Sequence, residues 1–221
     1  MQLEEIQPAL ALSENGVFDI KNSLIQNTQQ RITNGLTSDF DKTKTLFYFV
    51  RDKIKYSMFV PFFKREHYKA SLILSQKAGY CVQKAVLLTT LLRATGIPSV
   101  LLFADIINHK SPSNVFELMG TNYFTYHGYT AAYINHKWIK LTPAFDIEMC
   151  KKVNYPTVEF NKPKDAVFSP TDSQGNKFIE YSKLHGAYTD LPINEILTAW
   201  ETVYTKKRID TWKNFFKNFP T

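Results

Sequence analysis

Two side chains in this sequence have the chemistry for nucleophilic catalysis: a cysteine that opens a predicted helix and a histidine that opens a predicted strand. Cys81 follows Gly79 and Tyr80 and precedes the apolar run VQKAVLLTTLLRAT. The free amide groups at a helix N-terminus carry partial positive charge, which stabilises a thiolate and can receive an oxyanion. A buried, inert thiol is the alternative for any isolated cysteine.

The histidine lies in a predicted β-hairpin. Residues 127–134 and 137–142 have the composition of two strands, and Asn135-His136 between them suits a two-residue turn. His127 is the first residue of this hairpin. The other histidines lack such a context and are predicted to lie on the surface or in loops; they are His67, His109, His136 and His185.

The hairpin register selects the residues that can orient the imidazole. With the two-residue turn, His127 lies opposite Ala144, and Thr142 and Asp146 are its diagonal neighbours on the same face, roughly 7–8 Å away. Only Asp146 carries the negative charge that stabilises an imidazolium. Asp146 is therefore the favoured residue to join Cys81 and His127 by orienting the imidazole, and Thr142 is a close competitor. A helix cap or a turn is the alternative role for Asp146.

The segments around these residues predict mixed helical and strand structure. Apolar spacing predicts an amphipathic helix over 17–34, a second helix capped by Ser38 or Asp39, a short helix or turn over 70–78, the helix after Cys81, and a helix over 193–217. The apolar run over residues 99–107 predicts a buried strand. Loops are expected over 56–68, over 108–122 and through the proline-punctuated stretch after Pro143.

Bulk composition limits the protein class. The chain has 221 residues, 44% of them apolar and 21% charged, which is typical of one globular domain. No apolar run approaches the length of a membrane span, and the acidic start does not resemble a signal peptide, so a cytoplasmic location is expected. The two cysteines, Cys81 and Cys150, form no disulfide framework and have no zinc-ligand spacing, so we expect no metal and no cofactor.

The net charge of +7 raises the question of a nucleic-acid partner. The basic residues are spread along the chain, with their densest run at Lys206-Lys207-Arg208. No nucleic-acid-binding motif accompanies them, so a solvated, lysine-rich surface is the better interpretation.

The stretch ASLILSQKAGYCVQKAVLLTTLLRATGIPSV resembles the nucleophile segment of the transglutaminase-like superfamily. The resemblance rests on an Ala-Ser start at 70–71, Gly-Tyr-Cys at 79–81, an apolar helix over 85–92, and Leu-Leu-Arg-Ala-Thr-Gly-Ile-Pro at 91–98. Downstream, His127 and Trp138 match the histidine segment of the family. The family's usual Leu-Asp-Pro is replaced here by Leu-Thr-Pro, which puts Thr142 at the expected aspartate position.

The resemblance implies an α+β, papain-like fold in which N-terminal helices, including the nucleophile helix, pack on an antiparallel sheet. It implies a single domain over 1–221, with a core of about 17–146 and a loop-rich extension with a C-terminal helix over 147–221.

The implied activity is acyl transfer through a thioester, with Cys81 as nucleophile and His127 as base. The Cys81 amide would receive the oxyanion, with Tyr56, Gln76 or Tyr80 nearby. The expected substrate is a peptide, a protein or a small amide, and the acceptor is water or an amine, with water favoured. The main rival is a transglutaminase-like binding or scaffold domain without catalysis, which the Thr142 departure supports; a nucleic-acid binder is the second rival.

Overall fold

The computed structural model describes residues 1–216. Four helices form its N-terminal part: α1 (Ser23–Thr33), α2 (Asp39–Lys53), α3 (Ala70–Gln76) and α4 (Cys81–Ala94). The side chain of Ser38 accepts the Asp41 N–H and caps α2, as one of the two sequence alternatives predicted. Helix α1 begins later than expected, because Val17 and Phe18 enter the core from a bend that precedes it.

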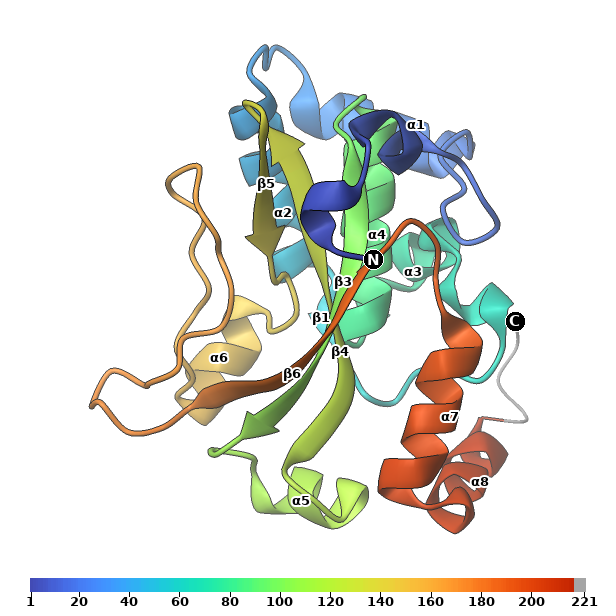
Figure 1. The fold of residues 1–221 in the computed structure, drawn as a ribbon, viewed down its shortest axis with the longest axis vertical. Coiled ribbons are helices and arrows are strands. Elements are labelled where there is room, and N and C mark those ends of the chain that lie inside the picture. Colours follow the sequence, from blue (N-terminus) through green and yellow to red (C-terminus); the bar gives the residue numbers. More distant parts are fainter. Residues whose placement is uncertain (217–221) are drawn as a thin grey trace.

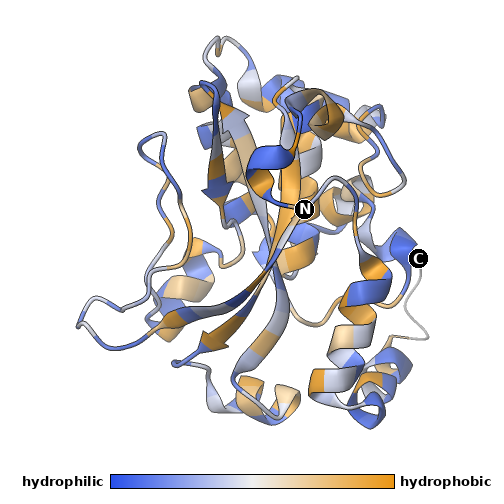
Figure 2. Cartoon of the chain, viewed as in Figure 1, coloured by the Kyte–Doolittle hydropathy of each residue, from blue (hydrophilic) through white to orange (hydrophobic). Residues whose placement is uncertain are grey.

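Helix α4 is the centre of the molecule. All of its side chains from Val82 to Arg93 are buried, between the sheet on one side and α1, α2 and α3 on the other. Figure 2 shows the apolar character of this helix and of the strands beside it. The Lys84 ammonium, although fully buried, donates to the carbonyls of Arg51 and Ile54 at the C-terminal end of α2. The apolar pattern after Cys81 therefore predicted this helix and its burial correctly.

The main sheet is antiparallel and four-stranded, in the order β5-β4-β3-β6 (Figure 1). Its strands are β3 (Ser99–Asn108), β4 (Tyr123–Ile134), β5 (Lys137–Leu141) and β6 (Ile179–Tyr188). Helix α4 covers one face. Short 3-10 turns at Leu3–Glu5 and Pro8–Leu12 contribute to a smaller apolar cluster on the other face.

The predicted hairpin is confirmed. Ile134 pairs with Lys137 and Thr130 with Leu141, which is the register of a two-residue turn. Asn135 and His136 both have positive φ, 50° and 63°, as that turn requires.

The segments expected as loops contain more regular structure than predicted. Helix α5 (Ser113–Met119) lies in the stretch 108–122, and α6 (Ile147–Val153) and β6 lie in the stretch after Pro143. The helix expected over 193–217 is two helices, α7 (Ile193–Tyr204) and α8 (Lys206–Phe215), and residue 217 lies outside the described residues. The break falls at Thr205, whose φ of 68° cannot continue a right-handed helix.

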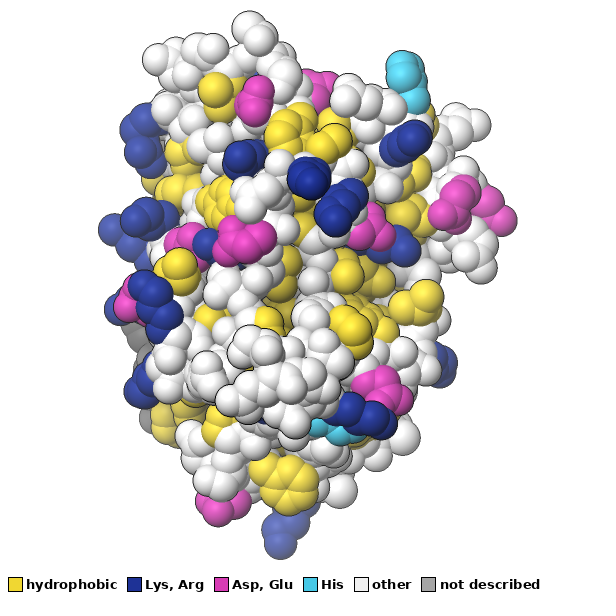
Figure 3. Space-filling model, turned by 90° about the vertical axis from the view of Figure 1, so that its left-hand side faces the viewer, with side chains coloured by type: hydrophobic (Ala, Val, Ile, Leu, Met, Phe, Trp, Pro, Cys, Tyr) yellow, Lys and Arg dark blue, Asp and Glu magenta, His cyan; other side chains and the backbone are white. Residues whose placement is uncertain are grey.

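The surface carries charges of both signs. Figure 3 shows lysine and arginine side chains interspersed with acidic ones on one face of the molecule. Among the described residues, no helix is long and apolar enough to cross a membrane.

Candidate active site

A short parallel pair of strands places Cys81. Strand β1 (Lys55–Tyr56) pairs with β2 (Ala78–Gly79), so that Tyr56 lies beside Gly79. The chain then turns through Tyr80 and begins α4 at Cys81, as the sequence predicted. The cysteine is therefore held at the first position of a fully packed helix, where its side chain stays half-buried.

Gly128, the residue after His127, brings β4 against this helix end. A Cβ at Gly128 would lie 2.8 Å from the Cα of Val82, so only glycine allows the strand to come this close. The N–H groups of Gly128, Val82 and Cys81 itself all act on the Cys81 sulfur and favour its thiolate. The backbone around the sulfur is therefore a set of donors, which is the arrangement that an oxyanion also needs.

Burial changes the protonation states that the sequence predicted. It raises the pKa of the Cys81 thiol to about 11, against the effect of the three N–H groups. Burial also lowers the pKa of His127 to about 3. The expectation that the helix N-terminus lowers the thiol pKa is therefore wrong for the free protein, in which desolvation outweighs the helix end. The resting pair is a neutral thiol and a neutral imidazole.

His127 lies in an aromatic setting. Its ring stacks on Tyr129, 5.9 Å away between centroids, and also contacts Phe168 and Tyr181. Its Nε2 is buried and has no hydrogen-bond partner among the described residues. No hydrogen bond in the described part of the chain joins the ring to the Cys81 sulfur, although both residues line the same cavity.

Asp146 is not the partner of His127 in the structure. One carboxylate oxygen accepts the Met149 N–H and caps α6, and the other accepts the Tyr56 N–H at 2.8 Å. The expectation that Asp146 orients the imidazole is corrected in favour of the alternative role, a helix cap. Asp146 thus also ties the loop after β5 to β1, the strand that pairs with β2 just before Cys81.

The Thr142 side chain, unlike the Asp146 carboxylate, is not engaged with backbone N–H groups. Its Oγ1 is buried and makes no hydrogen bond within the described residues, and the same holds for the Tyr181 hydroxyl. Burial raises the pKa of Tyr181 to about 12, and the neighbouring Thr142 hydroxyl counteracts part of that rise. The register of β4 and β5, continued beyond Leu141, places Thr142 on the face of the sheet that His127 occupies.

An acidic residue that the sequence analysis did not single out fixes the backbone before His127. Asp105 lies in β3 where β4 carries one extra residue, and Tyr126 in that bulge has a φ of 53°. The Asp105 carboxylate accepts the Tyr126 N–H and the hydroxyls of Thr125 and Tyr123. A lone acid inside the apolar run SVLLFADII was the signal that could have revealed it.

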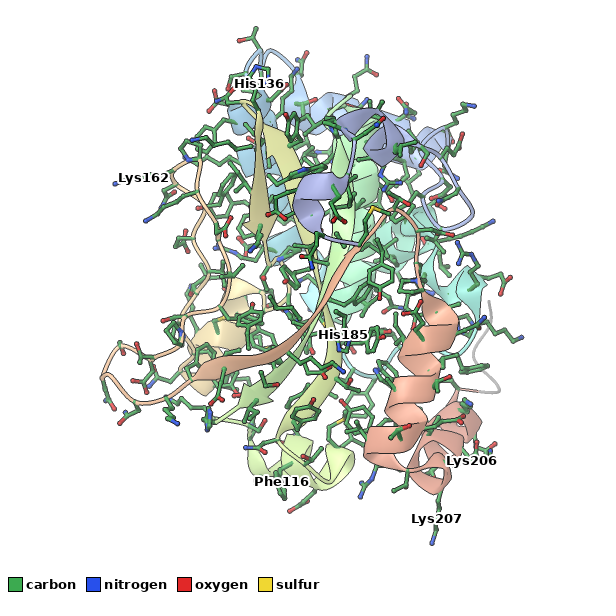
Figure 4. The ribbon with its side chains drawn as sticks, viewed as in Figure 1. Phe116, His136, Lys162, His185, Lys206 and Lys207 are labelled. Carbon is green, nitrogen blue, oxygen red and sulfur yellow. The ribbon has the colours of Figure 1, made fainter. Side chains whose placement is uncertain are left out.

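His185 completes this cluster from the other neighbouring strand. It lies in a bulge of β6, near the middle of the sheet in Figure 4, with its Nε2 2.7 Å from Asp105 and its ring stacked on Tyr126 at 4.0 Å. The prediction of a surface or loop position was therefore wrong for His185. It was also wrong for His67, whose side chain is buried against Phe63.

The three side chains expected near the oxyanion differ in whether they line the cavity. Tyr56 and Tyr80 line the cavity at Cys81, whereas Gln76 is exposed at the end of α3. The Tyr80 hydroxyl is already bonded to that of Tyr68 at 2.5 Å. Burial, followed by the Cys81 charge, raises the pKa of Tyr56 well above its usual value, so its hydroxyl stays protonated and able to donate beside the sulfur.

The cavity that contains Cys81 and His127 has a volume of about 690 Å³. Within residues 1–216, no group of three or more histidine, cysteine or acidic side chains is placed to hold a metal ion. The arrangement supports chemistry at the thiol, with backbone donors and a neutral imidazole close by.

The family model of the transglutaminase-like superfamily matches residues 26–143, more than half of the chain. The chain belongs to the transglutaminase-like superfamily. The matched region contains Cys81, His127 and Thr142, and it ends before Asp146. Helices α7 and α8 also lie outside it. The predicted α+β fold, with the nucleophile helix packed on an antiparallel sheet, is confirmed.

Solved structures with a similar fold include one described as a "Putative Cysteine Protease from Cytophaga hutchinsonii", with 16% identity and a TM-score of 0.49. The periplasmic domain of TgpA from Pseudomonas aeruginosa also has 16% identity, with a TM-score of 0.45. The similarity covers 65% and 63% of this transglutaminase-like chain, but only 44% and 48% of those two chains. A comparison with curated proteins gives no match.

Proposed function

We propose that this protein is a cysteine-nucleophile acyl-transfer enzyme that acts on an amide or ester carbonyl through a thioester on Cys81. The observation that carries the proposal is the close approach of β4 to α4. It puts the Gly128 N–H on the Cys81 sulfur and His127 in the wall of the same cavity. The substrate class, a peptide, a protein or a small amide, belongs to the proposal.

The chemistry proceeds from neutral groups. Cys81 Sγ attacks the carbonyl carbon while His127 takes the thiol proton, and the oxyanion is received by the backbone donors at the start of α4. His127 then gives the proton to the leaving group, and water hydrolyses the thioester. A catalytic hydrogen bond that is absent in the free enzyme can form when substrate is bound. The Thr142 hydroxyl is the group best placed to orient Nε2, because it is unpartnered and shares the face of His127.

The test is turnover of p-nitrophenyl acetate with mass spectrometry of the trapped acyl-enzyme. We expect Cys81→Ala and His127→Gln to abolish turnover and the acetyl adduct on Cys81. Cys150→Ser is the matched control, because Cys150 is buried within α6 and does not line the cavity. Equal turnover in wild type and Cys81→Ala would overturn the proposal. Adding a primary amine and measuring amide product distinguishes transfer from hydrolysis.

The second candidate function is a binding or scaffold domain without catalysis. It is favoured by the absence, among the described residues, of a carboxylate on His127 and by the high pKa of Cys81. It predicts no acyl-enzyme on Cys81 with any ester or amide, together with normal folding of the Cys81→Ala variant.

A further inference from the structure

The cavity at Cys81 is lined mainly by aromatic and aliphatic side chains from segments far apart in the sequence. One wall comes from the loop after β1, with Phe59 and Phe62, and from the core near Cys81. The other comes from α5, α7 and α8, with Trp200, Tyr204 and Trp212. Helices α7 and α8 lie outside the matched family region, so this wall is a contribution of the C-terminal extension.

The C-terminal wall is anchored to the active-site strand. The bulge before His127 takes Thr125 out of regular strand pairing, and α7 supplies partners for its backbone. The Tyr204 hydroxyl accepts the Thr125 N–H at 3.0 Å, and the Trp200 indole N–H donates to the Thr125 carbonyl at 3.3 Å. The cavity is therefore a fixed part of the fold and not a gap between loosely apposed segments.

A second anchor joins α8 to α5. The Arg208 guanidinium donates to the carbonyls of Glu117 and Leu118 at the end of α5, at 3.0 and 2.7 Å. It lies so close to Gly120 that a Cβ there would be 2.6 Å from one of its nitrogens. This arginine is thus committed to the protein backbone.

The cavity lining contains three charged side chains, Glu117, Lys207 and Arg208, all on α5 and α8. Lys207 projects outward from the start of α8 in Figure 4. Around Cys81 the lining includes aromatic rings: Trp200 contacts Tyr80, the residue before Cys81, and Phe145 contacts Tyr56. A charged group placed there would lose its hydration without gaining a partner.

We propose that this cavity holds the acyl group of the substrate and selects a large apolar one, such as an aryl-alkyl or branched aliphatic group; this inference rests on the proposed function. The acyl group remains bonded to Cys81 Sγ until hydrolysis, whereas the leaving group must depart before the acceptor enters. A fixed apolar cavity beside Sγ therefore suits the acyl side. Its volume, about 690 Å³, is within the usual range for small-molecule sites.

The reaction balances with water as the second substrate. The Sγ–C bond forms as the carbonyl–leaving-group bond breaks, and the thiol proton passes through His127 to the leaving group. Water then adds to the thioester, Sγ leaves as the C–O bond forms, and the proton returns to the thiol. No oxidant or other co-reactant is needed.

The experiment compares p-nitrophenyl esters of acetic acid, 3-phenylpropanoic acid and succinic acid on the full chain. The leaving group is constant, and each rate is divided by the rate with glutathione to remove intrinsic reactivity. We expect kcat/KM for the phenylpropanoyl ester to exceed that for the acetyl ester by about 10-fold or more. We expect the hemisuccinate, whose carboxylate would be desolvated, to fall below the acetyl ester. Equal rates, or a preference for the charged ester, would overturn the inference.

Single substitutions test whether the cavity lining causes the preference for a large apolar acyl group. Trp212→Ala should reduce the ratio of phenylpropanoyl to acetyl kcat/KM several-fold, whereas Trp138→Ala, a tryptophan on β5 outside the cavity, should leave it unchanged. Phe59→Ala serves as a second variant, because this lining residue is 64% exposed and contributes little to folding. An unchanged ratio in both lining variants contradicts the inference. Cys81-dependent turnover without acyl preference defeats this inference alone, whereas absence of turnover with every ester defeats the proposed function.

Discussion

At the scale of single residues, two opposing effects set the pKa of Cys81: desolvation raises it, and hydrogen bonds from backbone N–H groups lower it. Three N–H groups favour the Cys81 thiolate, but burial outweighs them, and His127 is too well buried to be protonated near neutral pH. The proposed reaction therefore does not begin from a preformed ion pair. In that reaction, contacts made with the bound substrate would stabilise the charges that develop on the thiol and the imidazole.

This balance predicts slow alkylation of Cys81 in the free protein. With a pKa near 11, Cys81 should react with iodoacetamide at pH 7 about 100-fold more slowly than a thiol of pKa ~8.5. The rate should rise about tenfold per pH unit above neutrality and keep this profile in His127→Ala. The measurement is mass spectrometry of a Cys150→Ser variant, with glutathione as the reference thiol. Fast labelling below pH 7 that disappears in His127→Ala would instead demonstrate an ion pair.

Gly128 is the residue on which the approach of β4 to α4 depends. Gly128→Ala places a methyl group 2.8 Å from the Val82 Cα, so the strand and the helix must separate. We expect a loss of roughly 1–3 kcal/mol in unfolding free energy. Ester turnover should fall by more than the unfolded fraction explains.

Gly35→Ala is the control for this change. Gly35 has a φ of 75° but no atom within 4 Å of a built Cβ, so the variant carries backbone strain without crowding. Urea unfolding and turnover should show stability loss alone. A Gly128→Ala enzyme with full activity per folded molecule would refute the role given to this contact.

At the scale of elements, strands β4 and β6 both bulge around one carboxylate. Burial alone would raise the pKa of Asp105, but hydrogen bonds from Tyr123, His185, Thr125 and the Tyr126 N–H lower it to about 2. The carboxylate thus holds Tyr126 in its left-handed conformation directly before His127. Backbone strain of this kind is commonly found at functional sites.

Asp105→Asn should therefore lower kcat more than it raises KM, because the variant disturbs the backbone that presents His127. A cost of roughly 1–3 kcal/mol in stability is expected near neutral pH. Because the folded-state pKa lies below the unfolded value of about 3.9, this stabilisation exists above pH ~4 and is lost as pH falls toward 2. The difference in stability between wild type and variant should shrink over that range.

A matched control is Asp172→Asn. Asp172 is also a buried acid, but it binds Lys110 and the backbone of a loop at 172–176, away from the cavity. This variant should lose stability while kcat per folded molecule stays unchanged. If both variants change kcat equally, the effect of Asp105 is only structural.

At the scale of the whole molecule, the central helix carries a buried lysine that joins it to α2. Burial lowers the pKa of Lys84 to about 7, and Asp146 and Asp52 counteract part of that effect. At this group the folded state therefore binds fewer protons than the unfolded state between pH 7 and about 10.5. The contribution of Lys84 to stability therefore rises with pH over this window, by about 2 kcal/mol from pH 7 to pH 9.

Lys84→Met tests this linkage. The variant keeps a side chain of similar length but has no titrating group, so the difference in urea stability between wild type and variant should change by about 2 kcal/mol in favour of wild type between pH 7 and pH 9. It should also be less stable than wild type at pH 9, because the carbonyls of Arg51 and Ile54 lose their donor. A stability difference that stays the same from pH 7 to pH 9 would contradict the lowered pKa of Lys84.

The sequence by itself determined the elements whose cause is local. Apolar spacing and the terminator at Gly96 predicted α4 with Cys81 at its start, and the turn at Asn135-His136 predicted the hairpin register. The motif around Cys81 predicted the family. The α5, α6 and β6 segments were missed, because their apolar patterns are weak, and β6 in particular is stabilised by pairing with the distant strand β3.

Only the tertiary structure decided the partners and the protonation states. The Asp146 carboxylate accepts a hydrogen bond from the Tyr56 N–H, 90 positions away in sequence. The Asp105 carboxylate bonds to residues of both neighbouring strands. The pKa values of Cys81 and His127 follow from how completely the fold excludes water, which no spacing along the chain encodes. The hydrogen bonds of helices and tight turns join residues that are close in sequence, so local sequence patterns predict them. Desolvation and pairing between distant segments arise only once the chain has packed.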